Sequence, residues 1–131
     1  VFAGYGGQLL APIHFESGLR YLHMHPGKLP IERGSTTIYY SILNRRNITV
    51  TAFYMTAQID AGQDVIYKEY AVPNKGVDID LWYDNIVRAD CFVNALSAIS
   101  KKQPLQTQTD EESMEYYVIH PVLKHVALLS L

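Results

Sequence analysis

The stretch ITVTAFYM, residues 48–55, constrains the fold more than any other part of the chain. It is rich in β-branched and aromatic residues, which pack well on a pleated surface and favour strands. Residues 56–63 contain a glycine suited to a loop, and residues 64–72 again have the composition of a strand. Because strands joined by a short loop pair antiparallel, the two segments predict a hairpin.

The other segments alternate between helical and extended patterns. With 131 residues the chain is about the length of one domain. We therefore expect an α/β fold with an open, mostly parallel central sheet, and a site at the strand ends. The expected elements are a short helix at 8–16, a strand at 21–24, a loop at 25–35, a helix at 36–43, a long helix at 79–100, a polar loop at 101–113, and an extended segment followed by a short helix from Pro121.

The segment 79–100 has apolar residues at intervals of three and four, which predicts an amphipathic helix. The lone cysteine, Cys91, lies in this pattern and is expected to be a small core residue. The apolar positions expected to face the core are Leu81, Trp82, Ile86, Ala89, Phe92, Val93, Leu96 and Ile99. Residues 1–100 are expected to form the body of the domain, and residues 101–131 a linker and an extension that packs on the domain or on a partner.

Charge and composition exclude several classes of function. The formal net charge is -2, and the basic pairs Arg45-Arg46 and Lys101-Lys102 suit solvated helix ends, so we expect no nucleic-acid partner. No run approaches the roughly 18 apolar residues of a membrane span, so no membrane partner is expected. A single cysteine fits a reducing compartment, and we expect a cytoplasmic protein.

Two histidines, His23 and His25, are the first candidates for chemistry. Alternate residues of a strand point to the same face, so both imidazoles face the same way just before the Pro26-Gly27 break. One interpretation is a capped turn with two half-exposed histidines, and the other is a ligand site at a strand end. Asp60 either meets an imidazole and tunes its pKa, or stabilises the turn that follows it.

The spacing of these residues resembles the catalytic half of the folate-dependent formyltransferases. That family transfers a formyl group from 10-formyltetrahydrofolate to an amine. The resemblance covers about residues 1–100, in order. The motifs that carry it are Ala3-Gly4-Tyr5-Gly6 with Gln8-Leu9-Leu10, His25-Pro26-Gly27-Lys28-Leu29-Pro30, Arg33-Gly34, and Ile59-Asp60-Ala61-Gly62.

The resemblance implies roles for particular residues. His25 and Asp60 take the family's catalytic histidine and aspartate, and His23 stands where the family has asparagine. Backbone and side chains that hold the 10-formyltetrahydrofolate would be Gly4, Tyr5, Gly6, Gly7, Gln8, Leu9, Gln58 and Ile59. The substrate loop would be formed by Pro26, Gly27, Leu29, Pro30, Arg33 and Gly34. The acceptor would be a small-molecule amine, with an amino sugar on a nucleotide as the preferred class, and no metal is implied.

Three alternatives remain open on the sequence. The exchange of asparagine for His23 makes the oxyanion contact depend on the histidine tautomer, which fits a folate site that binds without turnover, or an assembly module. The family's front half is absent from this sequence, so a missing N-terminal segment or a homo-oligomer would complete the acceptor pocket. A metal hydrolase using His23, His25 and Asp60 as ligands is the third reading. His120 and His125 are interpreted as structural.

Overall fold

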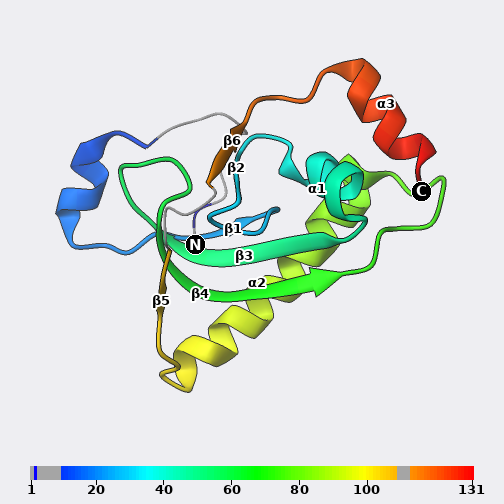
Figure 1. The fold of residues 1–131 in the computed structure, drawn as a ribbon. Coiled ribbons are helices and arrows are strands. Elements are labelled where there is room, and N and C mark those ends of the chain that lie inside the picture. The colour runs from blue at the N-terminus through cyan, green and yellow to red at the C-terminus, as the bar shows by residue number, and fades with distance from the viewer. Residues whose placement is uncertain (1, 3–9, 109–112) are drawn as a thin grey trace.

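The computed structural model describes Phe2 and residues 10–108 and 113–131. Pairs of consecutive strands alternate with helices along these residues (Figure 1). The elements are η1 (Pro12–Ser17), β1 (Leu22–His25), β2 (Glu32–Gly34), α1 (Thr37–Arg45), β3 (Ile48–Met55), β4 (Gly62–Tyr70), η2 (Ile79–Tyr83), α2 (Asp84–Ser100), β5 (Gln106–Thr107), β6 (Met114–Tyr116) and α3 (Pro121–Leu129), where η1 is a 3₁₀ helix and η2 a π-helical turn.

The main sheet has the order β1-β3-β4-β5, and each neighbouring pair in it is antiparallel. A separate pair, β2 and β6, is parallel. The predicted α/β class is confirmed, but the predicted mostly parallel sheet is wrong for the part of the chain that the structure describes. For β3 and β4 the physical reason is their connection, which is too short for the crossover that parallel strands require.

The β3–β4 hairpin is present as predicted, and its pairing shifts between Ala52 and Phe53. The shift is a β-bulge, which places Asp64 opposite Phe53. His23 pairs with Phe53 from the other side, and His25 pairs with Thr51. Directly paired residues share a face, so both histidines, Phe53 and Asp64 lie on one side of the sheet.

Helix α2 packs against the opposite side of the sheet, where it contacts β1, β3 and β4 (Figure 1). Its buried residues are the small or medium side chains Val87, Cys91, Ala95 and Ala98, which confirms the core position of Cys91. The predicted apolar face is largely wrong, because small side chains let α2 approach the sheet closely and the bulky ones point outward. The exposed residues are Leu81, Trp82, Ile86, Ala89, Val93 and Leu96, whereas Phe92 and Ile99 pack at the edge of the core.

The interior on the histidine side of the sheet is polar. Helix α1 reaches this side, because the hydroxyl of Thr37 donates to Pro26 O and Arg45 donates to the hydroxyl of Thr49. The buried polar residues of the described chain are His25, Glu32, Thr37, Ser41, Thr49, Thr51 and Asp64. Buried polar groups require partners, so this layer is held by directional bonds rather than by apolar contact alone.

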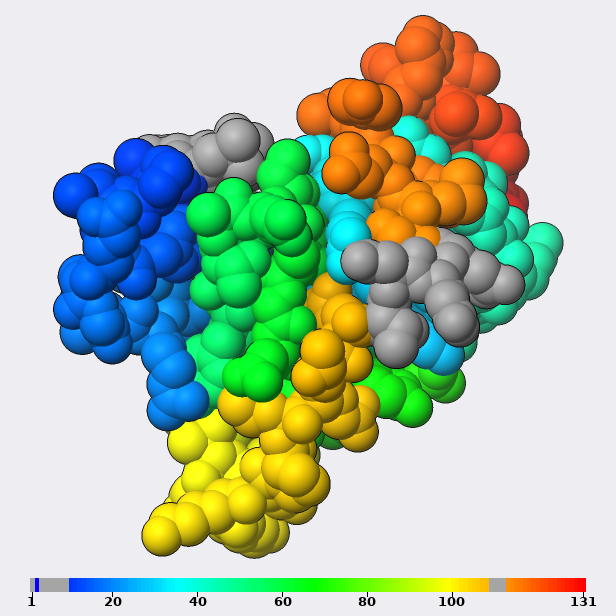
Figure 2. Space-filling view, turned by 60° about the vertical axis from the view of Figure 1, so that its left-hand side comes forward, coloured from blue at the N-terminus to red at the C-terminus, as the bar shows by residue number. Residues whose placement is uncertain are grey.

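The C-terminal segment lies against the loop after β1. Strand β6 pairs with β2, and the Ser35 nitrogen donates to Tyr116 O over 2.7 Å. In Figure 2 the orange residues of this segment sit beside cyan residues, across from the green hairpin. Helix α3 packs on α1, and His120 caps it by accepting from the Val122 nitrogen. No helix among the described residues has the length and apolar character needed to cross a membrane.

Candidate active site

His25 and Asp60, 35 positions apart in the chain, meet on the histidine side of the sheet. The Nδ1 atom of His25 lies 3.5 Å from Oδ2 of Asp60. The same oxygen accepts from the Gly34 nitrogen over 2.7 Å. Asp60 sits in the β3–β4 loop with a φ of 45°, a conformation that aspartate tolerates better than most residues. The predicted contact between the two groups is therefore confirmed.

The second ring nitrogen of His25 is fixed by the main chain. Nε2 lies 2.6 Å from the carbonyl oxygen of Glu32. A carbonyl can only accept, so Nε2 carries the proton, and Nδ1 of the neutral ring turns a lone pair toward Asp60. His25 is only 2% exposed, and burial lowers its pKa although the nearby Asp60 carboxylate acts in the opposite direction. At neutral pH the His25–Asp60 pair can therefore take up one more proton, at Nδ1 of His25.

His23, at the position where the resemblance implies asparagine, has its Nδ1 atom 3.2 Å from Phe2 O. Nδ1 therefore donates, and Nε2 of the neutral ring carries a lone pair. The ring also makes an edge contact with Phe53. Burial lowers the pKa of His23 more than the bond to Phe2 raises it. Unlike an asparagine amide, this side chain presents a donor at Nε2 only after it takes up a proton.

The predicted substrate loop is held from behind by buried hydroxyls. Thr51 donates to Gly27 O over 2.7 Å and accepts from the Leu29 nitrogen, and the Leu29–Pro30 peptide is cis. Thr37 donates to Pro26 O. A Cβ at position 27 would lie 2.8 Å from both Glu32 O and His25 Nε2, so only glycine fits there. The loop therefore packs directly on the imidazole.

Arg33 and Gly34, also predicted for this loop, lie in β2. Arg33 Nη2 donates to Gln108 Oε1, and Gln108 Nε2 donates to Asp64 Oδ1. Burial raises the pKa of Asp64 to about 6, although Gln108 and Arg33 act in the opposite direction. Asp64 was not singled out by the sequence, because the bulge that turns it inward leaves no local signature.

The predicted folate-binding residues are divided between described and undescribed parts of the chain. Gly4, Tyr5, Gly6, Gly7, Gln8 and Leu9 lie outside the described residues. Gln58 and Ile59 lie in the β3–β4 loop immediately before Asp60, and both are exposed. These two side chains are thus free to meet a ligand next to the His25–Asp60 pair.

Five further residues support the site and were missed by the sequence analysis: Glu32, Thr37, Ser41, Arg45 and Thr51. Arg45 was expected to be solvated, but its guanidinium pairs with the buried Glu32 carboxylate over 2.7 Å. A signal was present, because Thr37, Ser41 and Arg45 are spaced by four and share one face of a helix. Polar residues in register on the buried face of α1 indicate a polar partner inside the molecule.

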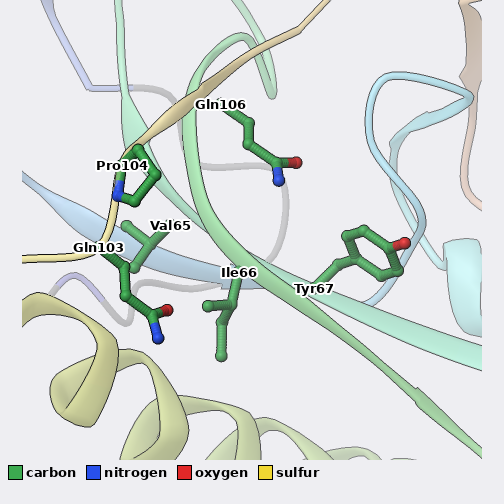
Figure 3. Close-up of a pocket in the computed structure, with 6 residues that line it drawn as sticks. All are labelled: Val65, Ile66, Tyr67, Gln103, Pro104 and Gln106. Carbon is green, nitrogen blue, oxygen red and sulfur yellow. The ribbon is translucent and has the colours of Figure 1, made fainter. Parts of the chain in front are cut away.

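Within the described ranges, no three His, Cys, Asp or Glu side chains gather in a way that could hold a metal ion. A hollow of about 420 Å³ lies between β4 and the segment after α2, where Figure 3 shows side chains from both. His23, His25 and Asp60 do not line this hollow. Its lining residues are Val65, Ile66, Tyr67, Gln103, Pro104 and Gln106.

Comparison with known proteins gives structural neighbours only. No family model matches the chain, and no curated protein does. A variant of HypX from Aquifex aeolicus superposes with a TM-score of 0.65 at 21% identity, over 89% of this chain and 23% of that one. A 4-N formyltransferase from Francisella tularensis gives a TM-score of 0.68 at 20% identity, over 95% and 57%. A sugar N-formyltransferase from Shewanella gives 0.64 at 20% identity, over 91% and 54%.

This chain therefore spans 54% of the Shewanella protein, 57% of the Francisella protein and 23% of HypX. The described residues have the fold of part of a formyltransferase domain.

Proposed function

We propose that this chain is part of an enzyme that transfers a formyl group from 10-formyltetrahydrofolate to the amine of an amino sugar carried by a nucleotide. Two structural neighbours support this class of substrates. The structure of the Helicobacter canadensis N-formyltransferase holds folinic acid and dTDP-3-aminofucose, and that of WlaRD, a sugar 3N-formyltransferase, was obtained with dTDP and 5-N-formyl-tetrahydrofolate.

The observation that carries the proposal is the contact between His25 and Asp60. In formyl transfer the amine nitrogen bonds to the formyl carbon, the bond from that carbon to the folate nitrogen breaks, and one proton passes from the amine to the leaving nitrogen. A base that first takes this proton and then returns it serves both steps. The neutral His25 ring and the Asp60 carboxylate together offer one such proton site.

The geometry favours a different division of labour from the one implied by the resemblance. Both ring nitrogens of His25 already face protein groups, whereas the Asp60 side chain is 16% exposed. Asp60 is therefore the member that meets the amine, and His25 Nδ1 shares the proton from behind. When the proton is on His25, the imidazolium and the Asp60 carboxylate form an ion pair, which stabilises the protonated state.

Stabilisation of the oxyanion falls to His23 in this proposal. A donor aimed at the developing oxyanion is worth about 10² to 10³ in rate. Since Nδ1 of His23 already donates to Phe2 O, the ring offers its Nε2 proton only in the charged form. This observation also favours a second candidate function, in which the site binds a folate and does not turn over.

Two measurements test the proposal. Calorimetry with folinic acid reports on the folate site, and turnover of 10-formyltetrahydrofolate with a panel of dTDP-amino sugars reports on transfer. Asp60→Asn keeps the shape and removes the base, so it should lower turnover by about 10² to 10⁴. Asp90→Asn removes an exposed partner of Lys68 on the far face and should leave turnover unchanged.

The outcomes separate the two candidate functions. Folinic acid binding together with turnover that Asp60→Asn abolishes supports the transferase. Folinic acid binding without turnover in the natural chain supports the second function, and in that case His23→Asn should restore measurable transfer, because the amide donates at any pH. Absence of folinic acid binding overturns both.

Partners and location belong to the same proposal. We expect a small-molecule acceptor, no nucleic acid and no membrane, and a cytoplasmic setting in which folate cofactors and a free thiol both persist. A second copy of the chain is a further proposed partner. Sedimentation of the purified chain with and without folinic acid measures whether the chain self-associates.

A further inference from the structure

Glu32 is the most completely buried carboxylate of the described chain, with 1% of the residue exposed. Its Oε2 atom accepts from the Lys28 nitrogen, the Ser41 hydroxyl and Arg45 Nη2, and its Oε1 atom accepts from Arg45 Nε. The guanidinium is thus bound at two points, the geometry that fixes direction as well as distance. Every oxygen of this buried charge has a partner.

The main chain of the same residue touches the candidate active site. The Glu32 carbonyl accepts from His25 Nε2 over 2.6 Å. Two residues further along β2, the Gly34 nitrogen donates to Asp60 Oδ2. One three-residue strand therefore contacts both members of the proton-sharing pair, and the Glu32 side chain anchors the end of it that holds the imidazole.

Net stability is a weak explanation for such a pair. Desolvation of two charges offsets much of their attraction, and apolar replacements of a buried ion pair are often neutral or stabilising. A bidentate pair does, however, add geometric specificity to its attraction, so it fixes the relative orientation of the two side chains that form it. Lys28 adds to this, since its nitrogen donates to the Glu32 side chain while its carbonyl accepts from the Glu32 nitrogen.

We propose that Glu32 and Arg45 are positioning residues, whose ion pair sets the Glu32 carbonyl and thereby the tautomer and orientation of His25. The inference rests on the proposed function, because the orientation of His25 matters to catalysis only if His25 and Asp60 share the proton of the amine. Neither residue touches the reacting atoms.

The primary test does not depend on turnover. Nitrogen-15 NMR of the full chain, with labelled histidine, reports which ring nitrogen of His25 carries the proton and how fast that proton exchanges with solvent. His25→Asn assigns the signal. In the natural chain we expect an Nε2 proton protected from exchange. In Glu32→Gln we expect exchange to accelerate at least about tenfold, since one charged partner of Arg45 is lost. Asp90→Asn, on the far face, should leave the His25 signal unchanged.

The kinetic test uses the same variants. Replacing a positioning residue, as in Glu32→Gln, should lower kcat by about tenfold to a hundredfold. The KM for the folate should stay within about twofold, because the replacement disturbs geometry rather than binding. Arg45→Lys keeps the charge and loses the bidentate fork, so its kcat should fall between those of the natural chain and Glu32→Gln.

Each outcome decides the inference. A folded Glu32→Gln chain with an unchanged His25 tautomer and unchanged exchange overturns it, whatever the turnover. If Glu32→Gln does not fold, Glu32→Met combined with Arg45→Met removes both charges, and an unperturbed His25 signal in that folded double variant overturns the inference. If the natural chain shows no turnover while the His25 signal responds as expected, the proposed function fails and the positioning role stands.

Discussion

Gly34 lies so close to Tyr116 that a Cβ at position 34 would overlap the carbonyl oxygen of Tyr116. The contact joins β2 to β6, which come from sequence positions about eighty residues apart. Gly34 also has a φ of 101°, in the region that favours glycine.

Gly34→Ala should therefore destabilise the chain by more than positive φ alone explains. Gly76 is the matched control, since it has a φ of 90° and open space around it. We expect Gly76→Ala to cost about 1 kcal/mol and Gly34→Ala at least about 2 kcal/mol more, because backbone atoms of β6 must move. Urea unfolding of both variants measures the difference, and equal losses would show that β6 does not press on Gly34.

Thr51→Val should destabilise the loop that packs on His25. The hydroxyl donates to Gly27 O and accepts from the Leu29 nitrogen. Valine has nearly the same shape but no hydroxyl, so both buried groups lose this hydrogen-bond partner. A cost of about 1 to 3 kcal/mol is expected. Thr107→Val, on an exposed position of β5, should stay within about 0.5 kcal/mol. Similar losses for the two variants would contradict the support assigned to Thr51.

Stability should fall as the pH drops below about 6.5, because burial lowers the pKa of both His23 and His25 from that ordinary value. Between 6.5 and the folded-state values the unfolded chain binds more protons, so acid favours unfolding. With an unfolded-state pKa of 6.5, each histidine can account for a loss of at most about 0.8 kcal/mol at pH 6 relative to pH 8. Unfolding at the two pH values measures the loss, and His25→Asn should shrink it.

A His25→Asn chain whose stability keeps the full dependence on pH would show that His25 titrates as it does in the unfolded chain.

Asp64→Asn should stabilise the chain at pH 8. Because burial raises the pKa of Asp64 to about 6 from 3.8, the folded chain binds more protons than the unfolded chain between those values. The resulting penalty is fully present above pH 6 and fades toward pH 4. The gain at pH 8 should be on the order of 1 kcal/mol, since partial solvation reduces the effect, and it should vanish near pH 4. A gain that is the same at both pH values would exclude titration as its cause.

Local patterns predicted those parts of the fold that local forces decide. The bounds predicted for β3 and the start predicted for α3 agree with the structure, and the bounds predicted for α1 lie within two residues of it, because alternation and helical spacing are visible over such lengths. Strand β2 was expected to be loop, since three residues carry no period and become a strand only through a distant partner. The core face of α2 was misassigned because apolar residues lie on two sides of that helix, and periodicity does not say which side meets a sheet.

The candidate site divides in the same way. The meeting of His25 and Asp60 could be predicted from the order of motifs along the chain. The part played by Glu32 could not, because it acts through its carbonyl, which every residue has. Likewise, no residue pattern near Asp64 predicts the bulge, because the bulge arises from the pairing of β4 with β3 and not from the local sequence.

The buried polar layer described above gives the two sides of the sheet different tolerance to change. On the α2 side, aliphatic side chains can exchange for one another as long as their total volume is kept. On the histidine side, a replacement of equal volume, such as threonine by valine, leaves buried carbonyls and amides without a hydrogen-bond partner. Side-chain volume therefore does not predict which replacements the fold tolerates there. Random substitutions in the interior should therefore accumulate on the α2 side of the sheet and be rare on the histidine side.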